Sequence, residues 1–166
     1  MRAAATVLAA TLMGAACAPA PQPVTALEAA DLFLSACLSQ APGFTTSEGL
    51  FATAGLSPVQ TGTYFHPTGD VSAKVLRREG ASTSAVMRCS VVYEGRNSEA
   101  VTALLTERLV PATGGESSPV QINVGGKPAL AWRVTVNGAS GSVIHLPNGG
   151  QGAPGALFAE FPILGV

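Results

Sequence analysis

The feature that most constrains the fold is the spacing of apolar residues, which becomes alternating from Thr61 onward. A period of two is typical of β-strands with one buried face. The clearest case is SAVMRCSVVYEG, where Ala85, Met87, Cys89, Val91 and Tyr93 form the expected core face. Similar patterns occur in TGTYFH, VSAKVLRR, PVQINV, ALAWRVTV, SVIHL and ALFAEFPIL, and turn compositions such as PTGD and GG lie between several of them. These short connections favour an antiparallel sheet.

Three other segments have helical spacing. Residues 24–44 begin with Thr25 and Glu28 in a capping box, and a second box at Thr45 and Glu48 opens a short helix. A third helix follows Asn97, an N-cap residue, and ends before Pro111. The expected apolar stripe of the first helix is Leu27, Ala30, Leu34, Cys37 and Leu38, and that of the third is Val101, Leu104, Leu105 and Leu109.

This order of segments predicts an α+β fold in one domain, residues 24–166. We expect an antiparallel sheet of about six or seven strands, with two or three helices packed on one face. The order is α-(α)-βββ-α-βββ(β), which hints at two αβββ units. Residue identity between the halves is too low to claim a duplication.

The N-terminal segment MRAAATVLAATLMGAAC has the features of a secretory signal peptide. Arg2 precedes an uncharged run, residues 3–16, which is shorter than the roughly 20 residues of a membrane-spanning helix. Cleavage by ordinary signal peptidase after Cys17-Ala18 or Pro19-Ala20 would place proline directly after the cut. Cleavage between Ala16 and Cys17 avoids this, so residues 1–16 are the expected leader.

The segment MGAAC resembles the lipobox of the small lipoproteins of Gram-negative bacteria, although Gly14 stands where leucine is commonest. The resemblance implies that Cys17 becomes the first mature residue and carries lipid. Residues 17–23, CAPAPQP, would then form a stiff, extended stalk. Ala18 replaces the aspartate that often retains such proteins in the inner membrane, which favours a periplasmic location at the outer membrane. The alternative is that Cys17 is an ordinary thiol in a leader.

The chain contains three cysteines. If Cys17 carries lipid, Cys37 and Cys89 remain as a pair in an oxidising compartment. Both lie on expected core faces, one on the first helix and one on a strand. A disulfide between them would attach that helix to the sheet, and the alternative is two separate buried thiols.

The sequence assembles no catalytic set, and we assign no catalytic residue, metal or cofactor. His66 and His145 have no second ligand at metal-binding spacing. The glycine pattern GQGAPG is followed by a strand pattern, whereas a dinucleotide site requires a helix there. The enzymatic alternative is a small periplasmic hydrolase that uses His66 or His145 with Asp70 or Glu94.

The formal net charge is −1, and removal of Arg2 with the leader makes it −2. No basic run occurs, so nucleic acid is not an expected partner. On the outward face of the sheet, Lys74, Arg88 and Arg133 are a candidate site for an anionic ligand such as a lipid phosphate or a cell-wall carboxylate. The alternative is a solvated face on which Arg88 pairs with Glu94 or another acid.

These observations favour a non-catalytic binding or accessory module of the cell envelope. Its expected partners are the membrane, through the N-terminal lipid, and an envelope protein or anionic envelope ligand. A further alternative, inhibition of a wall-degrading enzyme, needs a rigid protruding loop. The candidate loop, PNGGQGAPG, is rich in glycine, which counts against it.

Overall fold

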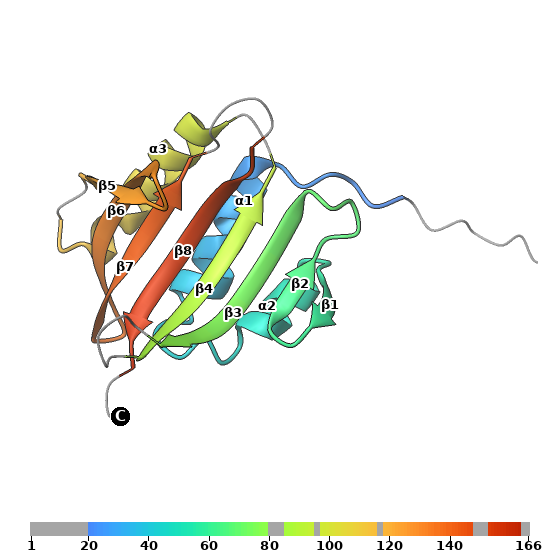
Figure 1. Cartoon of the computed structure of the whole chain (residues 1–166), viewed down its shortest axis with the longest axis horizontal. Coiled ribbons are helices and arrows are strands. Elements are labelled where there is room, and N and C mark those ends of the chain that lie inside the picture. Colours follow the sequence, from blue (N-terminus) through green and yellow to red (C-terminus); the bar gives the residue numbers. More distant parts are fainter. Residues whose placement is uncertain (1–19, 80–84, 95–96, 116–117, 148–152, 164–166) are drawn as a thin grey trace, which may run out of the picture.

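The computed structural model describes residues 20–79, 85–94, 97–115, 118–147 and 153–163. The leader, Cys17 and most of the loop PNGGQGAPG lie outside these residues. Within them, the chain forms three α-helices and one eight-stranded antiparallel sheet (Figure 1). The α+β class predicted from the sequence is therefore confirmed. No helix in these ranges is long and apolar enough to cross a membrane.

The helices lie on one face of the sheet, behind the strands in Figure 1. Helix α1 (Ala26–Phe33) continues directly into a π-helix, η1 (Leu34–Leu38). Helix α2 spans Ser47–Thr53, and α3 (Ser98–Leu109) ends in a 3₁₀ turn, η2 (Val110–Ala112). Because α1 packs against both α3 and β4, it lies near the middle of the helical layer.

The sheet has the strand order β1-β2-β3-β4-β8-β7-β6-β5. It therefore consists of two four-stranded meanders whose last strands, β4 and β8, pair at the centre. Their register runs from Val86 opposite Pro162 to Tyr93 opposite Gly155. The strands are β1 (Ser57–Gln60), β2 (Thr63–Phe65), β3 (Val71–Glu79), β4 (Ala85–Tyr93), β5 (Val120–Val124), β6 (Lys127–Val136), β7 (Ala139–Leu146) and β8 (Gly155–Pro162).

Strand β1 is the element that the sequence pattern missed. All four of its residues are exposed, so it has no apolar alternation to recognise. Pro58 lacks a backbone N–H, which is tolerated because β1 is an edge strand. Each half of the sheet therefore has four strands, whereas three were expected in the first half.

The predicted helix starts are partly confirmed. At α1, the Thr25 hydroxyl accepts from the Glu28 backbone N–H at 3.2 Å, and the Glu28 carboxylate accepts from the Thr25 N–H at 2.8 Å. The Thr25 hydroxyl also donates to the Glu28 carboxylate, and the two hydrogen bonds that this carboxylate accepts from Thr25 lower the pKa of Glu28. The second box is wrong, because α2 begins at Ser47 after Thr46, which makes no side-chain cap. Asn97 precedes α3 but likewise makes no side-chain cap.

The buried face of α1 and η1 agrees with the predicted stripe at Ala30, Cys37 and Leu38 and differs from it at Leu27 and Leu34. Ala26, Ala29 and Phe33 face the core, whereas Leu27 is 39% exposed and Leu34 is partly buried. Small alanine side chains allow the helix axis to approach the sheet closely, and Phe33 fills the space further along. Leu27 and Leu34 are therefore displaced toward the outer side of the helical layer, whereas Leu38 is buried in the core.

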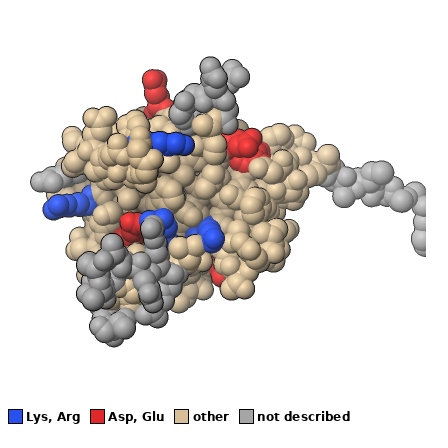
Figure 2. All heavy atoms as spheres, in the orientation of Figure 1, with Lys and Arg blue, Asp and Glu red and all other residues tan. Residues whose placement is uncertain are grey.

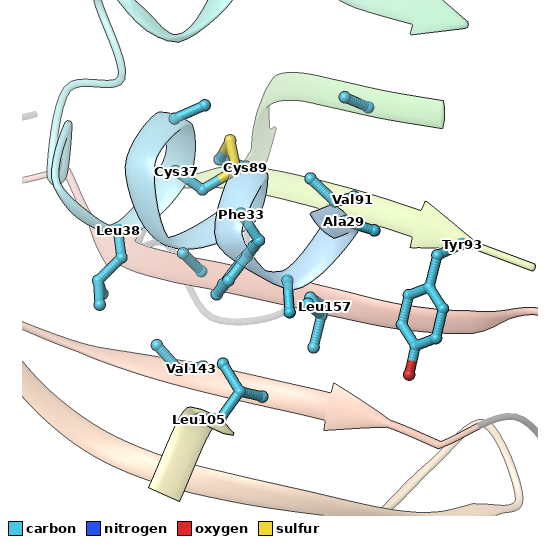
Figure 3. Packing of buried hydrophobic residues seen from close by; sticks show 14 of the residues in the cluster. Ala29, Phe33, Cys37, Leu38, Cys89, Val91, Tyr93, Leu105, Val143 and Leu157 are labelled. Atoms are coloured by element: carbon cyan, nitrogen blue, oxygen red, sulfur yellow. A yellow bond between two sulfur atoms is a disulfide. The ribbon is translucent and has the colours of Figure 1, made fainter. Parts of the chain in front are cut away.

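The disulfide between Cys37 and Cys89 joins η1 to β4, with a Cα–Cα distance of 5.4 Å. Both cysteines are fully buried. Figure 3 shows the bond beside Phe33 and Val91, where the helices meet the two central strands. The predicted pairing of these cysteines is confirmed, and it attaches the helical layer to the middle of the sheet.

Candidate functional site

The outward face of the sheet carries the predicted cations, but the register separates them. Arg88 lies opposite Glu160, Glu160 opposite Ser142, and Ser142 opposite Arg133, across four neighbouring strands. Three strand spacings place Arg88 and Arg133 about 14 Å apart. The two guanidinium groups therefore cannot easily share a single carboxylate.

Arg88 is already paired within the protein. Its Nε and Nη2 atoms both contact Oε1 of Glu160, and its guanidinium lies over the Phe158 ring at 5.2 Å. The acid that pairs with Arg88 is thus Glu160, and the Glu94 pairing considered from the sequence does not form. Lys74 lies diagonally beside Arg88, opposite Ser90, and is exposed.

Arg133 has a different environment. It borders a hollow with a volume of about 860 Å³, formed by the ends of β6, β7 and β8 together with the segment after α3. Hydroxyl groups line much of the hollow, namely those of Thr113, Thr135, Ser140 and Ser142. Within the ranges that the structure describes, Arg133 makes no ion pair. The hollow thus presents an exposed guanidinium, hydroxyl groups and the Glu160 carboxylate.

Charges are segregated between the two layers of the protein. Among the strand residues whose side chains the structure describes, four are cationic and one is anionic: Lys74, Arg88, Lys127, Arg133 and Glu160. The α-helices carry five carboxylates and one cation: Glu28, Asp31, Glu48, Glu99, Glu107 and Arg108. Figure 2, which looks onto the sheet, shows a few cationic and a few acidic side chains spread over a mainly uncharged face. This field attracts anions to the sheet face and cations to the helical face.

His66 and Asp70 do lie together, in the turn between β2 and β3. His66 Nδ1 is 3.4 Å from Asp70 Oδ1, and the Thr68 hydroxyl contacts both groups. The other Asp70 oxygen accepts from the backbone N–H of Val24 at 2.5 Å. Burial raises the pKa of Asp70, but the hydrogen bonds from Thr68 and Val24 outweigh burial and lower it. These contacts indicate that the cluster fixes the chain where the proposed stalk meets α1.

His145 is fully buried, and among the described residues it makes no ion pair with a carboxylate. Its Nε2 lies 2.8 Å from the Tyr93 hydroxyl, and its Nδ1 lies 3.1 Å from the Thr102 hydroxyl. Since Thr102 donates its own proton to the Ser98 carbonyl, Nδ1 must be the protonated nitrogen of the neutral ring and Nε2 the acceptor. Burial lowers the pKa of His145 to about 4. This neutral imidazole joins α3 to the sheet.

Gly155 makes room for this buried cluster. A Cβ at this position would lie 2.4 Å from the Tyr93 ring, so only glycine lets β8 pass beneath the tyrosine. Burial raises the pKa of Tyr93, which therefore stays neutral and donates to His145. The packing indicates a structural role for both residues.

The sequence did not reveal the other groups around Arg133. The alternation of apolar residues in ALFAEFP places Glu160 on the outward face, so the sequence could have predicted this residue there. The position of β8 between β4 and β7 could not be read from that pattern. Within the described ranges, no three His, Cys, Asp or Glu side chains form a group that could hold a metal ion.

Comparisons of this chain with protein-family models, curated proteins and solved structures find no match. The geometry described above is therefore the basis for the function proposed below.

Proposed function

We propose that this chain is an exported, lipid-anchored protein of the cell envelope, held in the periplasm at the outer membrane through Cys17. The leader, the cysteine at its expected cut and the proline-rich stalk support this location. The buried disulfide is typical of proteins that fold in an oxidising compartment. On this proposal, the domain acts there as a non-catalytic binding module.

Mass spectrometry of the mature N-terminal peptide tests the anchor. We expect the first residue to be Cys17, with the mass of attached diacylglycerol and, in full maturation, an amide-linked acyl chain. Acyl chains contribute about 0.8 kcal/mol per buried methylene, so two or three chains retain the protein in the membrane fraction after washing with salt. A mature N-terminus with an unmodified Cys17, or one that starts after it, would contradict the proposal.

The binding site that we propose is the hollow beside Arg133. The observation that carries this proposal is an exposed guanidinium that makes no ion pair with any described residue and lies among hydroxyl groups, on the cationic layer of a protein with a net negative charge. A guanidinium binds the two oxygens of a carboxylate or phosphate in a planar, bidentate geometry. The neighbouring hydroxyls and Glu160 can accept or donate hydrogen bonds to a polyhydroxylated ligand. The proposed ligand is an anionic, hydroxyl-bearing group of an envelope polymer or lipid.

Replacement of Arg133 tests this site. For Arg133→Ala we expect affinity to fall about tenfold or more, because a hydrogen bond to a charged group contributes roughly 1.5–3 kcal/mol. Arg133→Lys keeps the charge but not the bidentate geometry, so we expect an intermediate loss. Calorimetry on the protein in nanodiscs of zwitterionic lipid would use soluble peptidoglycan fragments as the carboxylate probe and glycerol phosphate as the headgroup probe.

The matched control is Lys127→Ala, which removes an exposed cation of the same face outside the hollow. We expect little change in this variant. Preference for one probe would identify the source of the anion. Equal affinities for wild type and Arg133→Ala, or equal losses in Arg133→Ala and Lys127→Ala, would refute a specific site at Arg133.

A further inference from the structure

A second surface feature borders the hollow beside Arg133, and the two share Pro111, Ala112 and Thr135 in their linings. A groove with a volume of about 920 Å³ runs between α1 with η1 on one side and α3 with η2 on the other. Its apolar lining includes Leu32, Leu34 and Leu38 from the first wall, Ala112 from the second and Val136 from β6. The turn at Asn137, which donates a hydrogen bond to the Ala41 carbonyl, borders the groove. The groove is open along its length to solvent.

Three leucines of α1 and η1 form an apolar stripe that runs from the surface into the core. Leu38 is buried, Leu34 packs partly against the core, and Leu27 lies at the surface outside the groove lining. Leu27, Leu34 and Leu38 are spaced seven and four residues apart, which places them along one side of a helix. Leu27 is 39% exposed and Leu34 is partly buried, while the alanines of α1 face the sheet. A helix with one apolar face on the core and another at the surface is suited to contact a further element.

The charges at the groove favour a cationic occupant. Glu28 and Asp31 line the α1 wall, and Arg108 lines the α3 wall. Within the described ranges, Asp31 and Arg108 make no ion pair. The helical layer as a whole carries five carboxylates and one cation. A second copy of this chain would bring two such layers together and meet like charges, which disfavours self-association here.

The backbone of the occupant is constrained as well. The lining comes from helices, the 3₁₀ turn and the end of β6 near Asn137. Apart from that strand end, it presents few backbone N–H and C=O groups with which an extended peptide could form hydrogen bonds. A helical segment satisfies its own backbone hydrogen bonds and needs only an apolar face for the groove. A third helix can also pack into the groove between two neighbouring helices.

We propose that this groove is the docking site for a basic amphipathic helix of a partner protein. Its apolar side would pack on Leu34, Leu38 and Val136. Its lysine or arginine side chains would lie beside Glu28 and Asp31. The groove adjoins the hollow beside Arg133, with which it shares Pro111, Ala112 and Thr135. The two proposals differ in the chemistry of the occupant, which is a cationic helix in the groove and an anionic ligand in the hollow.

A synthetic helical peptide provides the probe. It would have about 18 residues, long enough for substantial helix, with leucines on one face and lysines on both flanks. Two peptides serve as controls. The glutamate peptide has glutamates in place of the lysines, and the scrambled peptide has the same composition as the lysine peptide. Fluorescence anisotropy on the protein in zwitterionic nanodiscs, with empty nanodiscs as the blank, would report binding. We expect saturable binding of the lysine peptide alone.

Two variants test whether this binding occurs in the groove. Leu34→Ser removes the central leucine, and we expect the affinity to fall about tenfold because a buried leucine contributes 1.5–3 kcal/mol. Val59→Ser removes an apolar side chain that is 60% exposed on β1, remote from the groove, and we expect no change. Asp31→Lys should reduce the preference of the protein for the lysine peptide over the glutamate peptide.

Several results would overturn the proposal. They are no saturable binding of the lysine peptide, equal binding of the scrambled peptide, or equal effects of Leu34→Ser and Val59→Ser. A dimer in sedimentation that Leu34→Ser abolishes would assign the groove to a second copy instead. Circular dichroism of each variant would establish that it is folded before its binding is compared.

Discussion

Reduction of the Cys37–Cys89 disulfide is expected to lower the free energy of unfolding by about 4 kcal/mol. The bond closes a loop across a sequence separation of 52 residues, and its loss restores that chain entropy to the unfolded state. The expected loss is a large fraction of the roughly 5–15 kcal/mol that stabilises a typical domain. It should therefore shift the denaturation midpoint strongly. Denaturant unfolding with and without reductant measures the difference.

The double variant Cys37→Ala with Cys89→Ala is the control for this experiment. It should unfold near the reduced protein and show no further response to reductant. Because both sulfurs are fully buried, the variant also loses some core packing, so it should be no more stable than the reduced protein. A difference below about 1 kcal/mol between oxidised and reduced protein would show that the chain-entropy argument fails here.

Acidification from pH 6.5 to pH 4 is expected to remove about 3 kcal/mol of stability through His145 alone. The pKa of His145 is about 4 in the folded protein, against 6.5 for an ordinary histidine. In this window the unfolded chain takes up a proton that the folded protein does not bind. Its contribution to stability is therefore fully present above pH 6.5 and is lost as the pH falls toward 4.

The hydrogen bonds of the buried His145 ring also disfavour its protonation in the folded protein. A proton on Nε2 would face the Tyr93 hydroxyl, which donates to that nitrogen in the neutral form. The variant His145→Gln lacks the titrating ring and should show a flatter dependence of unfolding free energy on pH between 6.5 and 4. It should also be less stable at pH 7, because it loses the fitted contacts to Tyr93 and Thr102. Parallel pH profiles for the two proteins would refute the assignment of the slope to His145.

The strand patterns and the pairing of the cysteines were predictable from local sequence. Alternation placed Cys89, Val91 and Tyr93 on the core face because the side chains of a strand project to opposite sides in turn. Cys37 was predicted to face inward, and it does so although it lies in a π-helical turn. These inferences needed the period of each element, the count of cysteines and the expected lipidation of Cys17, which leaves the other two cysteines as a pair.

The candidate sites were less predictable. The sequence predicted Arg88 and Arg133 on one face, but the order of the strands put Glu160 beside the first and left the second without an ion pair among the described residues. The groove depends on which side of α1 faces the sheet. Leucine is more hydrophobic than alanine, yet Ala29 is buried and Leu27 is exposed, because the close approach of helix and sheet leaves little room there.

The sequence by itself determined the α+β class, the inward faces of most strands, the disulfide pair and the expectation of export. Each follows from local periodicity, composition or the number of cysteines. Only the tertiary structure decided that β8 inserts between β4 and β7, that Arg133 borders a hollow and that α1 presents leucines to a groove. Strand order and helix rotation depend on contacts between residues far apart in the chain, and local patterns carry no information about which distant partner gives the best packing.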